Sequence, residues 1–193
     1  MTIIGITGGI GSGKSTLSRL LETFGIPVYI ADTEAKKLMN TSPDIKRRLI
    51  QKFGEAIYSE GNLNRKKLAS LIFCNPEAVS YVNSVVHPAV QSDFINWTKS
   101  GFYPVVAVES AILFESGFNS LVDFTVTVSA ALEIRIKRIS ERDHLSKKEI
   151  TDRIANQIPE EERISRSDFV IINDDYHALI PQIESLIEAN RFS

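Results

Sequence analysis

Glycine, serine and one lysine are concentrated near the start of the chain, in the segment GGIGSGKS at residues 8–15. This segment matches the P-loop pattern GxxxxGK(S/T), and it stands between an apolar run and an amphipathic helical pattern. Glycines let a loop wrap so that successive backbone N–H groups point at one spot, where the start of the next helix adds its positive dipole. The sequence therefore predicts a phosphate-binding site. The alternative is a glycine-rich turn with an unrelated lysine.

The motif also predicts a role for each polar side chain around the phosphates. Lys14, expected on an exposed loop, would reach the β and γ phosphates of a nucleotide, and the Ser15 hydroxyl would complete a Mg²⁺ shell. The residues expected to bind the nucleotide through this motif are Gly8, Gly9, Gly11, Ser12, Gly13, Lys14, Ser15 and Thr16.

Two acidic residues follow or end predicted strands. Asp32 comes directly after the strand 28–30, and Glu109 ends the strand that begins at residue 105. Parallel strands bring their carboxyl ends to the same sheet edge as a P-loop. Asp32 could orient or deprotonate an acceptor hydroxyl, bind Mg²⁺ through water, or cap a helix that begins at Thr33. Glu109 could hold the water shell of the metal, or it could face solvent.

A histidine and several arginines are further candidates. The pair His87-Pro88 is expected to interrupt a helical region between two apolar stripes. A lone histidine more often has a structural role, in a core or a helix cap, than a contact with a ligand. Arg138, Arg142 and Arg153 lie on a charged flap. One of them could stabilise charge on a transferred phosphoryl group, while the others would be solvated.

Five short apolar runs rich in β-branched residues predict the strands that position these groups: 3–7, 28–30, 105–108, 124–128 and 169–172. Helical patterns separate the runs, which predicts a three-layer α/β fold of the P-loop NTPase type with a mostly parallel five-stranded sheet. Leu17, Leu20, Leu21 and Phe24 form one apolar stripe, and Gly25 is the expected stop of that helix.

Two stretches are too long or too charged to be simple connections. We expect residues 33–100 to form a helical acceptor-binding subdomain, with helix starts at Ser42-Pro43 and Asn75-Pro76, and residues 138–163 to form a helical lid. The nucleotide core of this single-domain chain of 193 residues would then comprise 1–32, 101–137 and 164–193. The sequence contains neither a DxxG nor an NKxD motif, which argues against a GTPase and favours a small-molecule kinase.

The composition is that of an ordinary globular protein, with 43% hydrophobic and 24% charged residues. A net charge of −2 gives no basic excess for nucleic acid, and the apolar window 102–114 is too short and too interrupted to cross a bilayer. The single cysteine, Cys74, can form no internal disulfide and is expected to be a small buried side chain. With no basic N-terminal region of a signal peptide, we expect a cytoplasmic protein, a monomer or small homo-oligomer, with neither nucleic acid nor membrane as partner.

Several separated stretches agree, in order and spacing, with one family. They are TGGIGSGKST, VYIADTEAKKL, GNLNRKKLASLIF, VNSVVHPAV, AILFESGF, KRISERD, RIANQ and DFVIIND. Together they resemble the dephospho-coenzyme A kinase family over nearly the whole chain. The HP after VNSVV and the LFESG segment are not shared by adenylate or shikimate kinases.

The resemblance implies ATP-dependent phosphorylation of the ribose 3′-hydroxyl of dephospho-coenzyme A, which gives coenzyme A and ADP in the last step of coenzyme A synthesis. It implies ATP, Mg²⁺ and dephospho-coenzyme A as cofactors and partners. Carried onto this sequence, it makes Asp32 the proposed base, Lys14 and Ser15 the phosphate and Mg²⁺ ligands, and Arg142 the lid arginine. Arg65, His87 and Pro88 match the acceptor side, and Asn173 matches an asparagine near the adenine.

The chain departs from the family pattern in two places. Family members commonly carry Asp-Ala-Asp where this chain has Ile30-Ala31-Asp32, and many carry Pro-Leu-Leu-Phe-Glu where this chain has AILFE at residues 111–115. Glu109 could take over the duty of the missing acid as a metal ligand. Two other functions stay open: a P-loop kinase for another nucleotide or small alcohol, and a nucleotide-sensing module without turnover. The acceptor-side segments favour the dephospho-coenzyme A kinase.

Overall fold

The computed structural model describes residues 1–73, 75–143, 146–155 and 157–189. Cys74, expected in a buried position, lies outside the described residues. The chain divides into two compact units, one made of Met1–Ile30 and Phe102–Ser193, the other of Ala31–Gly101.

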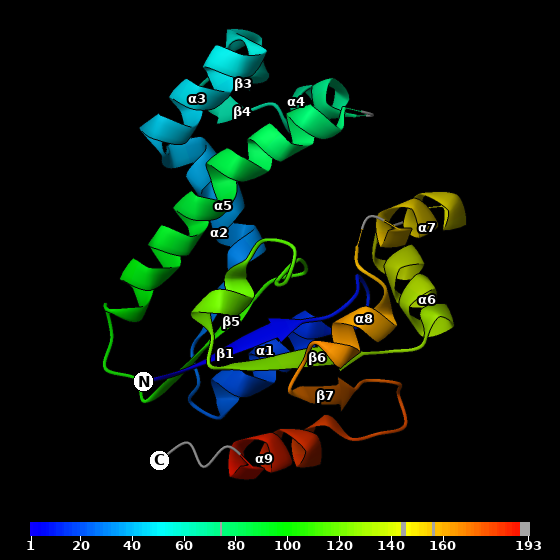
Figure 1. Cartoon of the computed structure of the whole chain (residues 1–193). Coiled ribbons are helices and arrows are strands. Elements are labelled where there is room, and N and C mark those ends of the chain that lie inside the picture. The colour runs from blue at the N-terminus through cyan, green and yellow to red at the C-terminus, as the bar shows by residue number, and fades with distance from the viewer. Residues whose placement is uncertain (74, 144–145, 156, 190–193) are drawn as a thin grey trace. The chain divides into compact units, whose positions relative to one another are not determined.

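The first unit is built on a parallel sheet of five strands: β1 (Thr2–Thr7), β2 (Val28–Ile30), β5 (Val105–Glu109), β6 (Phe124–Ser129) and β7 (Phe169–Ile172). Their order is β2-β5-β1-β6-β7, and every neighbouring pair runs parallel (Figure 1). The predicted five-stranded α/β fold is confirmed, with strand bounds within one residue of those expected. The first strand lies in the middle, so the loop after it emerges at the centre of the carboxyl edge.

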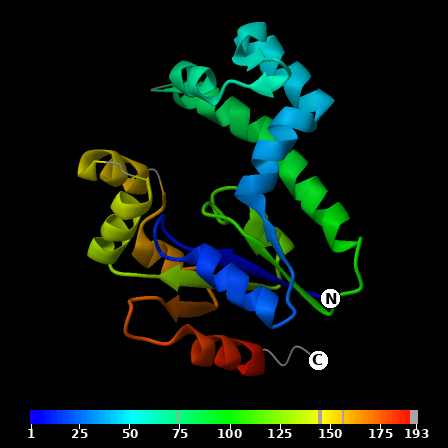
Figure 2. The same cartoon turned by 180° about the vertical axis from the view of Figure 1, so that it is seen from behind.

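Helices cover both faces of this sheet. On one face lie α1 (Lys14–Thr23) and α9 (Leu179–Ala189) (Figure 2). Their apolar side chains pack with Ile4, Ile6 and Val126 in a buried core. On the other face, α8 (Glu160–Ser165) contacts β6, and the 3₁₀ helix η2 (Phe118–Leu121) contacts β1. The helices α6 (Leu132–Asp143) and α7 (Lys147–Ala155) complete the unit. Successive side chains of a strand point to opposite faces, and these strands are apolar along their length, so both faces need a helical cover.

The helix α1 follows its predicted apolar stripe except at Phe24, which lies just after the last helical residue and is exposed. Leu17 and Leu21 of its apolar stripe are fully buried, and the helix ends at Thr23, two residues before Gly25. Gly25 has a φ of 80° and donates to the carbonyl of Glu22, which closes the last turn.

The second unit contains α2 (Ala31–Thr41), α3 (Pro43–Phe53), the 3₁₀ helix η1 (Glu55–Ile57), α4 (Arg65–Ile72) and α5 (Pro76–Thr98). The predicted starts of α3 and α5 are confirmed, because Ser42 Oγ accepts from the Ile45 N–H and Asn75 Oδ1 accepts from the Ala78 N–H.

Two features of this unit differ from the sequence prediction. A short antiparallel pair, β3 (Tyr58–Ser59) and β4 (Asn62–Leu63), interrupts a stretch expected to hold only helices and turns. The strands are too short for a visible alternation, and the turn at Glu60 and Gly61 uses positive φ without the usual Asn-Gly signal.

The expected interruption at His87-Pro88 is wrong, because α5 continues through Pro88 to Thr98. Proline removes one helical hydrogen bond. Buried residues on both sides of it, Val85, Val86, Val90 and Phe94, keep the helix continuous by packing.

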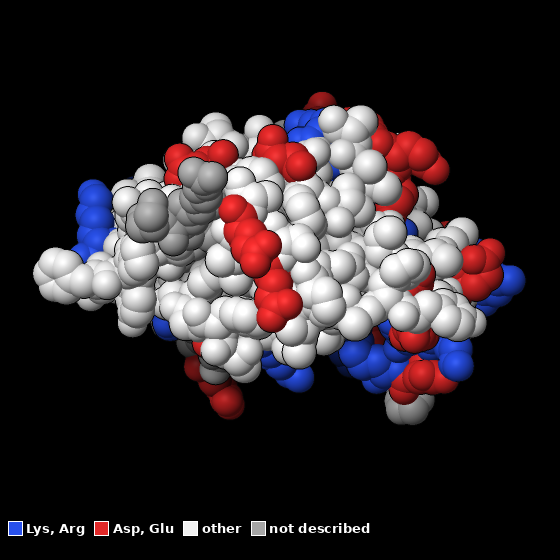
Figure 3. Space-filling model, turned by 90° about the horizontal axis from the view of Figure 1, so that it is seen from below, with Lys and Arg blue, Asp and Glu red and all other residues white. Residues whose placement is uncertain are grey.

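Within the described part of the chain, no helix has the length and apolar character needed to span a membrane. Figure 3 shows the face seen from below as largely uncharged, with acidic atoms near its middle and most basic atoms toward its margin.

Candidate active site

The phosphate loop connects β1 to α1 at the carboxyl edge of the sheet. Gly11 and Gly13 have φ values of 82° and 99°, which favour glycine, and a Cβ on Gly13 would lie 1.9 Å from Asn173 Nδ2. No side chain caps α1, which begins at Lys14. The loop therefore presents an uncapped helix start, as an anion site requires.

Lys14 lies inside this loop. Its Nζ donates to the carbonyl of Gly8 at 2.9 Å and to that of Gly9 at 3.4 Å, and the residue is only 9% exposed. The expectation of an exposed lysine is therefore wrong, because the loop wraps around the side chain. Ser15 and Thr16, in contrast, are exposed in the first turn of α1.

Glu109 lies at the end of β5 and is 6% exposed. Its Oε2 accepts a hydrogen bond of 2.7 Å from Ser18 Oγ, so the alternative of a solvent-facing acid is wrong. Ser15 and Ser18 are three residues apart in α1 and therefore lie on the same face of the helix. The Glu109 carboxylate, bound to Ser18, is thus about one helical turn from Ser15. Sequence reasoning missed Ser18, whose only signal is this spacing from Ser15.

Hydroxyl and carboxylate oxygens are the donors that Mg²⁺ prefers. Ser15 and Glu109 therefore fit a magnesium ion in donor chemistry. No group of three or more His, Cys, Asp or Glu residues that could hold a metal occurs among the residues that the structure describes. The rest of a magnesium shell would have to come from phosphate oxygens and water.

Two residues far along the chain meet at the carbonyl of Ser12. Asn173 donates to it from Nδ2 at 2.8 Å, and Arg138 donates from its guanidinium at 3.4 Å. Arg138 also pairs with Asp175, in the turn after β7. Of the three flap arginines named from the sequence, Arg138 thus contacts the phosphate loop.

Arg142 and Arg153 pair with Asp143 instead. Arg142 pairs with it at 2.7 Å and Arg153 at 3.7 Å, and both arginine side chains are more than half exposed. The hydrogen bond to Asp143 raises the pKa of Arg142 above its ordinary value. A role for Arg142 at the phosphates stays a prediction.

Sequence reasoning missed two residues that contact the loop at Ile10. Arg135 Nε donates to the Ile10 carbonyl at 3.0 Å, and Gln157 Oε1 accepts from the Ile10 N–H at 2.8 Å. Arg135 carries no local signal, since an arginine in a charged helical stretch ordinarily faces solvent. Gln157 ends the RIANQ stretch of the resemblance, but nothing in that stretch indicates a contact with the loop.

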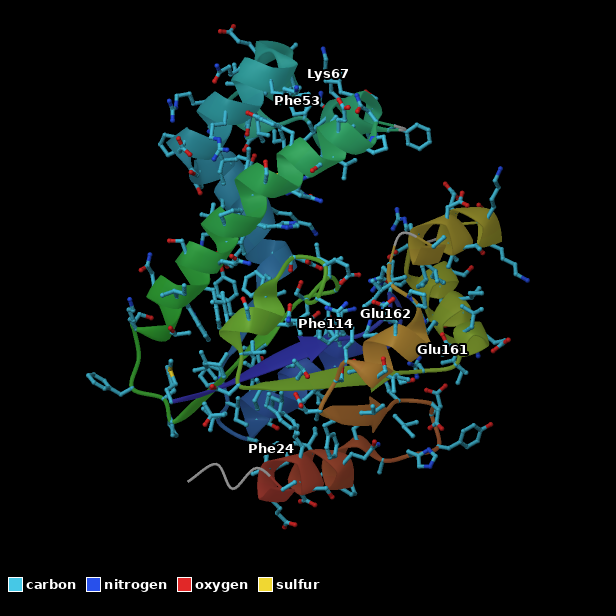
Figure 4. The ribbon with its side chains drawn as sticks, in the orientation of Figure 1. Phe24, Phe53, Lys67, Phe114, Glu161 and Glu162 are labelled. Atoms are coloured by element: carbon cyan, nitrogen blue, oxygen red, sulfur yellow. The ribbon has the colours of Figure 1, made fainter. Side chains whose placement is uncertain are left out.

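The segment after β5 is joined to α8. Phe114 and Glu162 are labelled in Figure 4, and Arg166 links them: its guanidinium lies 4.4 Å from the Phe114 ring centre and pairs with Glu162 at 3.2 Å. Glu115 Oε1 also accepts from the Ile158 N–H. The AILFESGF stretch of the sequence is therefore held by side-chain contacts.

Asp32, Arg65 and His87 belong to the second unit. Asp32 is the second residue of α2, which begins at Ala31, so the alternative of a cap for a helix starting at Thr33 is wrong. Arg65 is the exposed first residue of α4. His87 is half-buried in α5, and burial lowers its pKa below the ordinary value, which favours a neutral imidazole near neutral pH.

A family model described as dephospho-CoA kinase matches residues 2–178. The chain belongs to the dephospho-CoA kinase family. A dephospho-CoA kinase of Bacteroides fragilis is 47% identical over 185 residues, which cover 95% of this chain and 90% of that protein. The dephospho-CoA kinase of Porphyromonas gingivalis is 42% identical over 192 residues, 99% of this chain and 95% of its own.

Solved structures share the fold of this chain. Protein TT1252 from Thermus thermophilus is 34% identical with a TM-score of 0.83, over 98% of this chain and 95% of that one. A shikimate kinase of Bacteroides thetaiotaomicron, 16% identical with a TM-score of 0.56 over 98% of each chain, shares the P-loop kinase fold alone. Membership of the family makes this protein a transferase of the P-loop kinase type.

Proposed function

We propose that the protein transfers the γ-phosphoryl group of ATP to the ribose 3′-hydroxyl of dephospho-coenzyme A. The bond between the γ-phosphorus and the β,γ-bridging oxygen breaks, ADP leaves, and the 3′-oxygen forms the new bond and loses its proton. The observation that carries the proposal is a complete phosphate loop, with its lysine held inside it, in a chain of this family.

The phosphate loop supplies charge stabilisation. Phosphoryl transfer passes through a loose transition state, so catalysis depends mostly on positioning and on neutralising oxygen charges. The Lys14 ammonium already lies at the loop, and the start of α1 adds its dipole. Asn173 and Arg138 support the Ser12 carbonyl between them.

Ser15 and Glu109 are the residues that would hold Mg²⁺, Ser15 through its hydroxyl and Glu109 through the water shell. The ion would neutralise charge on the phosphate oxygens. Because Ser18 donates to Glu109 Oε2, the carboxylate is already oriented before any ion binds.

The acceptor-side residues lie in the second unit. Asp32 would orient or deprotonate the 3′-hydroxyl, while Arg65 and His87 would contact the acceptor. The neutral imidazole of His87 can donate or accept a hydrogen bond but adds no positive charge. A cytoplasmic location and a monomeric or small homo-oligomeric state belong to the same proposal.

An assay of ADP release tests the function. The protein is given ATP and Mg²⁺ with dephospho-coenzyme A, AMP, adenosine or shikimate, and the product is identified by mass spectrometry. We expect turnover with dephospho-coenzyme A far above that with the other three acceptors. Preference for another acceptor would make the protein a different P-loop kinase, and ATP binding without any turnover would make it a sensing module.

A further inference from the structure

We infer that Arg135 and Gln157 are positioning residues that hold the backbone of Ile10 in the phosphate loop. They thereby make nucleotide binding depend on residues 157–163, the last part of the predicted lid, which we call the lid segment. Both backbone polar groups of Ile10 are bound by these side chains. The inference concerns nucleotide binding, and it rests on the proposed function only where the acceptor enters the test.

Arg135 is buried against the loop. It is 5% exposed, and its Nε donates to the Ile10 carbonyl at 3.0 Å. A Cβ on Gly9 would lie 2.2 Å from an Arg135 guanidinium nitrogen, while the φ of Gly9 lies outside the left-handed region. Gly9 is therefore a glycine because the guanidinium needs the space, and not because of its backbone conformation.

Gln157 binds the other backbone polar group of Ile10, in the peptide that joins Gly9 to Ile10. Its Oε1 accepts from the Ile10 N–H at 2.8 Å, and its Nε2 donates to the Ala111 carbonyl at 3.0 Å. A single amide thus joins the phosphate loop to the segment after β5. Both ends of the amide are used, so a substitution cannot keep both hydrogen bonds unless it keeps a donor and an acceptor.

Glu160, in the lid segment, connects that segment to Arg135 of α6. Its Oε2 accepts from Arg135 and from Arg163, each at 3.0 Å, and Arg163 also donates to the Ile158 carbonyl at 2.8 Å. Arg163 is 1% exposed. Two buried guanidinium groups share one carboxylate, so the position of Arg135 depends on the lid segment keeping its place.

The contacts at Ile10 are linked to Lys14 through the peptide group between Gly9 and Ile10. The Gly9 carbonyl, which precedes Ile10, accepts from the Ser12 N–H at 3.1 Å and from Lys14 Nζ at 3.4 Å. The Gly9 carbonyl and the Ile10 N–H form one peptide group, so a shift of that group moves a carbonyl that accepts from the lysine. Displacements of about 1 Å at a site can cost on the order of 100-fold in rate.

The variant Arg135→Gln, which lacks the guanidinium, tests the inference. Its affinity for ADP is measured by calorimetric titration without any acceptor, and its KM for dephospho-coenzyme A is measured separately by steady-state kinetics. We expect the Kd for ADP to rise about tenfold, which is the scale of one or two lost hydrogen bonds, while the KM for dephospho-coenzyme A stays within about twofold of wild type. Lys137→Gln, an exposed position on the same helix, is the matched control and should leave both constants unchanged. Equal ADP affinity in Arg135→Gln and Lys137→Gln would overturn the inference, as would an equal rise in both constants.

A double-mutant cycle distinguishes positioning from general destabilisation. Gly9→Ala puts a methyl group where the guanidinium lies and leaves the charge of Arg135 in place. We expect it to weaken ADP binding as Arg135→Gln does, and the double variant to be no worse than the worse single variant. Losses that simply add would show that the two residues act independently.

Gln157→Met gives a second route if Arg135→Gln fails to fold. It keeps the side-chain length and removes both hydrogen bonds, and we expect the same selective loss of ADP affinity. Wild-type ADP affinity in this variant would contradict the inference. Because ADP binding is measured alone, a wild-type protein that binds ADP but does not phosphorylate dephospho-coenzyme A would contradict the proposed function and leave this test intact.

Discussion

The ammonium group of Lys14 is held within the phosphate loop, since it donates to the Gly8 carbonyl and the residue is only 9% exposed. We expect Lys14→Ala to lower kcat/KM on the order of 100- to 1,000-fold, because it removes a charge placed at the transferred group. Two loop carbonyls also lose a donor, so stability should fall by about 1 kcal/mol. ADP release and thermal unfolding measure the two effects, and turnover near that of wild type would remove the loop lysine from the mechanism.

Asp32 is a second residue whose charge can be tested. Because α2 begins at Ala31, Asp32→Asn removes no cap and costs at most about 1 kcal/mol of interaction with the helix dipole. If Asp32 acts as a base or a metal anchor, Asp32→Asn should lower kcat on the order of 100-fold or more. Asp44→Asn is the matched control, since Asp44 also lies in the first turn of a helix of this unit. Equal activity in both variants would return Asp32 to an ordinary surface role.

Excess Mg²⁺ separates the two roles of Asp32. If the carboxylate anchors the metal, raising Mg²⁺ should restore part of the kcat of Asp32→Asn by mass action. If it acts on the acceptor hydroxyl, no concentration of Mg²⁺ should help.

The burial of His87 should make the free energy of unfolding depend on pH. Burial lowers its pKa in the folded protein, so the unfolded chain binds more protons below the ordinary value of about 6.5. The folded state is therefore favoured fully above that pH and loses this contribution as pH falls toward the lowered pKa. We expect His87→Gln to lose less stability than wild type between about pH 7.5 and pH 5 in denaturant titrations. Parallel losses in the two proteins would contradict the burial of this histidine.

At the scale of the element, α6 presents two arginines one turn apart with different surroundings. Arg138 contacts the Ser12 carbonyl, whereas Arg142 pairs with Asp143 and is mostly exposed. Arg138→Ala should weaken ATP binding in the free enzyme, because it removes a contact that already exists. Arg142→Ala should lower kcat more than it weakens ATP binding if Arg142 reaches the phosphates only when the lid closes.

Titration with an ATP analogue and steady-state kinetics on both variants check this pair. Equal losses in kcat and affinity for Arg142→Ala would make it an ordinary ligand of bound ATP. No loss in either would make it a solvated residue. An unchanged affinity in Arg138→Ala would show that its contact with Ser12 does not hold the loop.

The whole molecule should respond to the nucleotide as a ligand of the folded state. A ligand present at 100 times its Kd stabilises the folded state by about 2.7 kcal/mol. We expect ADP to raise the unfolding midpoint of wild type, and to raise it less in Lys14→Ala at the same concentration. Adenosine, which lacks phosphates, is the control ligand. A shift with adenosine as large as that with ADP would place the binding energy outside the phosphate loop.

Local patterns in the sequence predicted most of the sheet and the phosphate loop. Hydrophobic runs marked the five strands of the sheet within one residue, because a strand buried on both faces must be apolar along its length. The GGIGSGKS segment predicted the loop, since glycine spacing and the lysine are contiguous in the chain. The continuity of α5 through Pro88 did not follow from local preference, because packing of its buried residues overrides the proline.

The sequence by itself determined the phosphate loop, the strands of the parallel sheet and the family to which the chain belongs, since each is read from short runs of contiguous residues and the order of these runs along the chain. Only the tertiary structure decided that Lys14 is buried, that Ser18 orients Glu109, and that Arg135 and Gln157 hold Ile10. The last three of these contacts join residues 91, 125 and 147 positions apart. No local pattern encodes such pairs, because what brings them together is the burial of the elements that carry them and the need of each buried polar group for a partner.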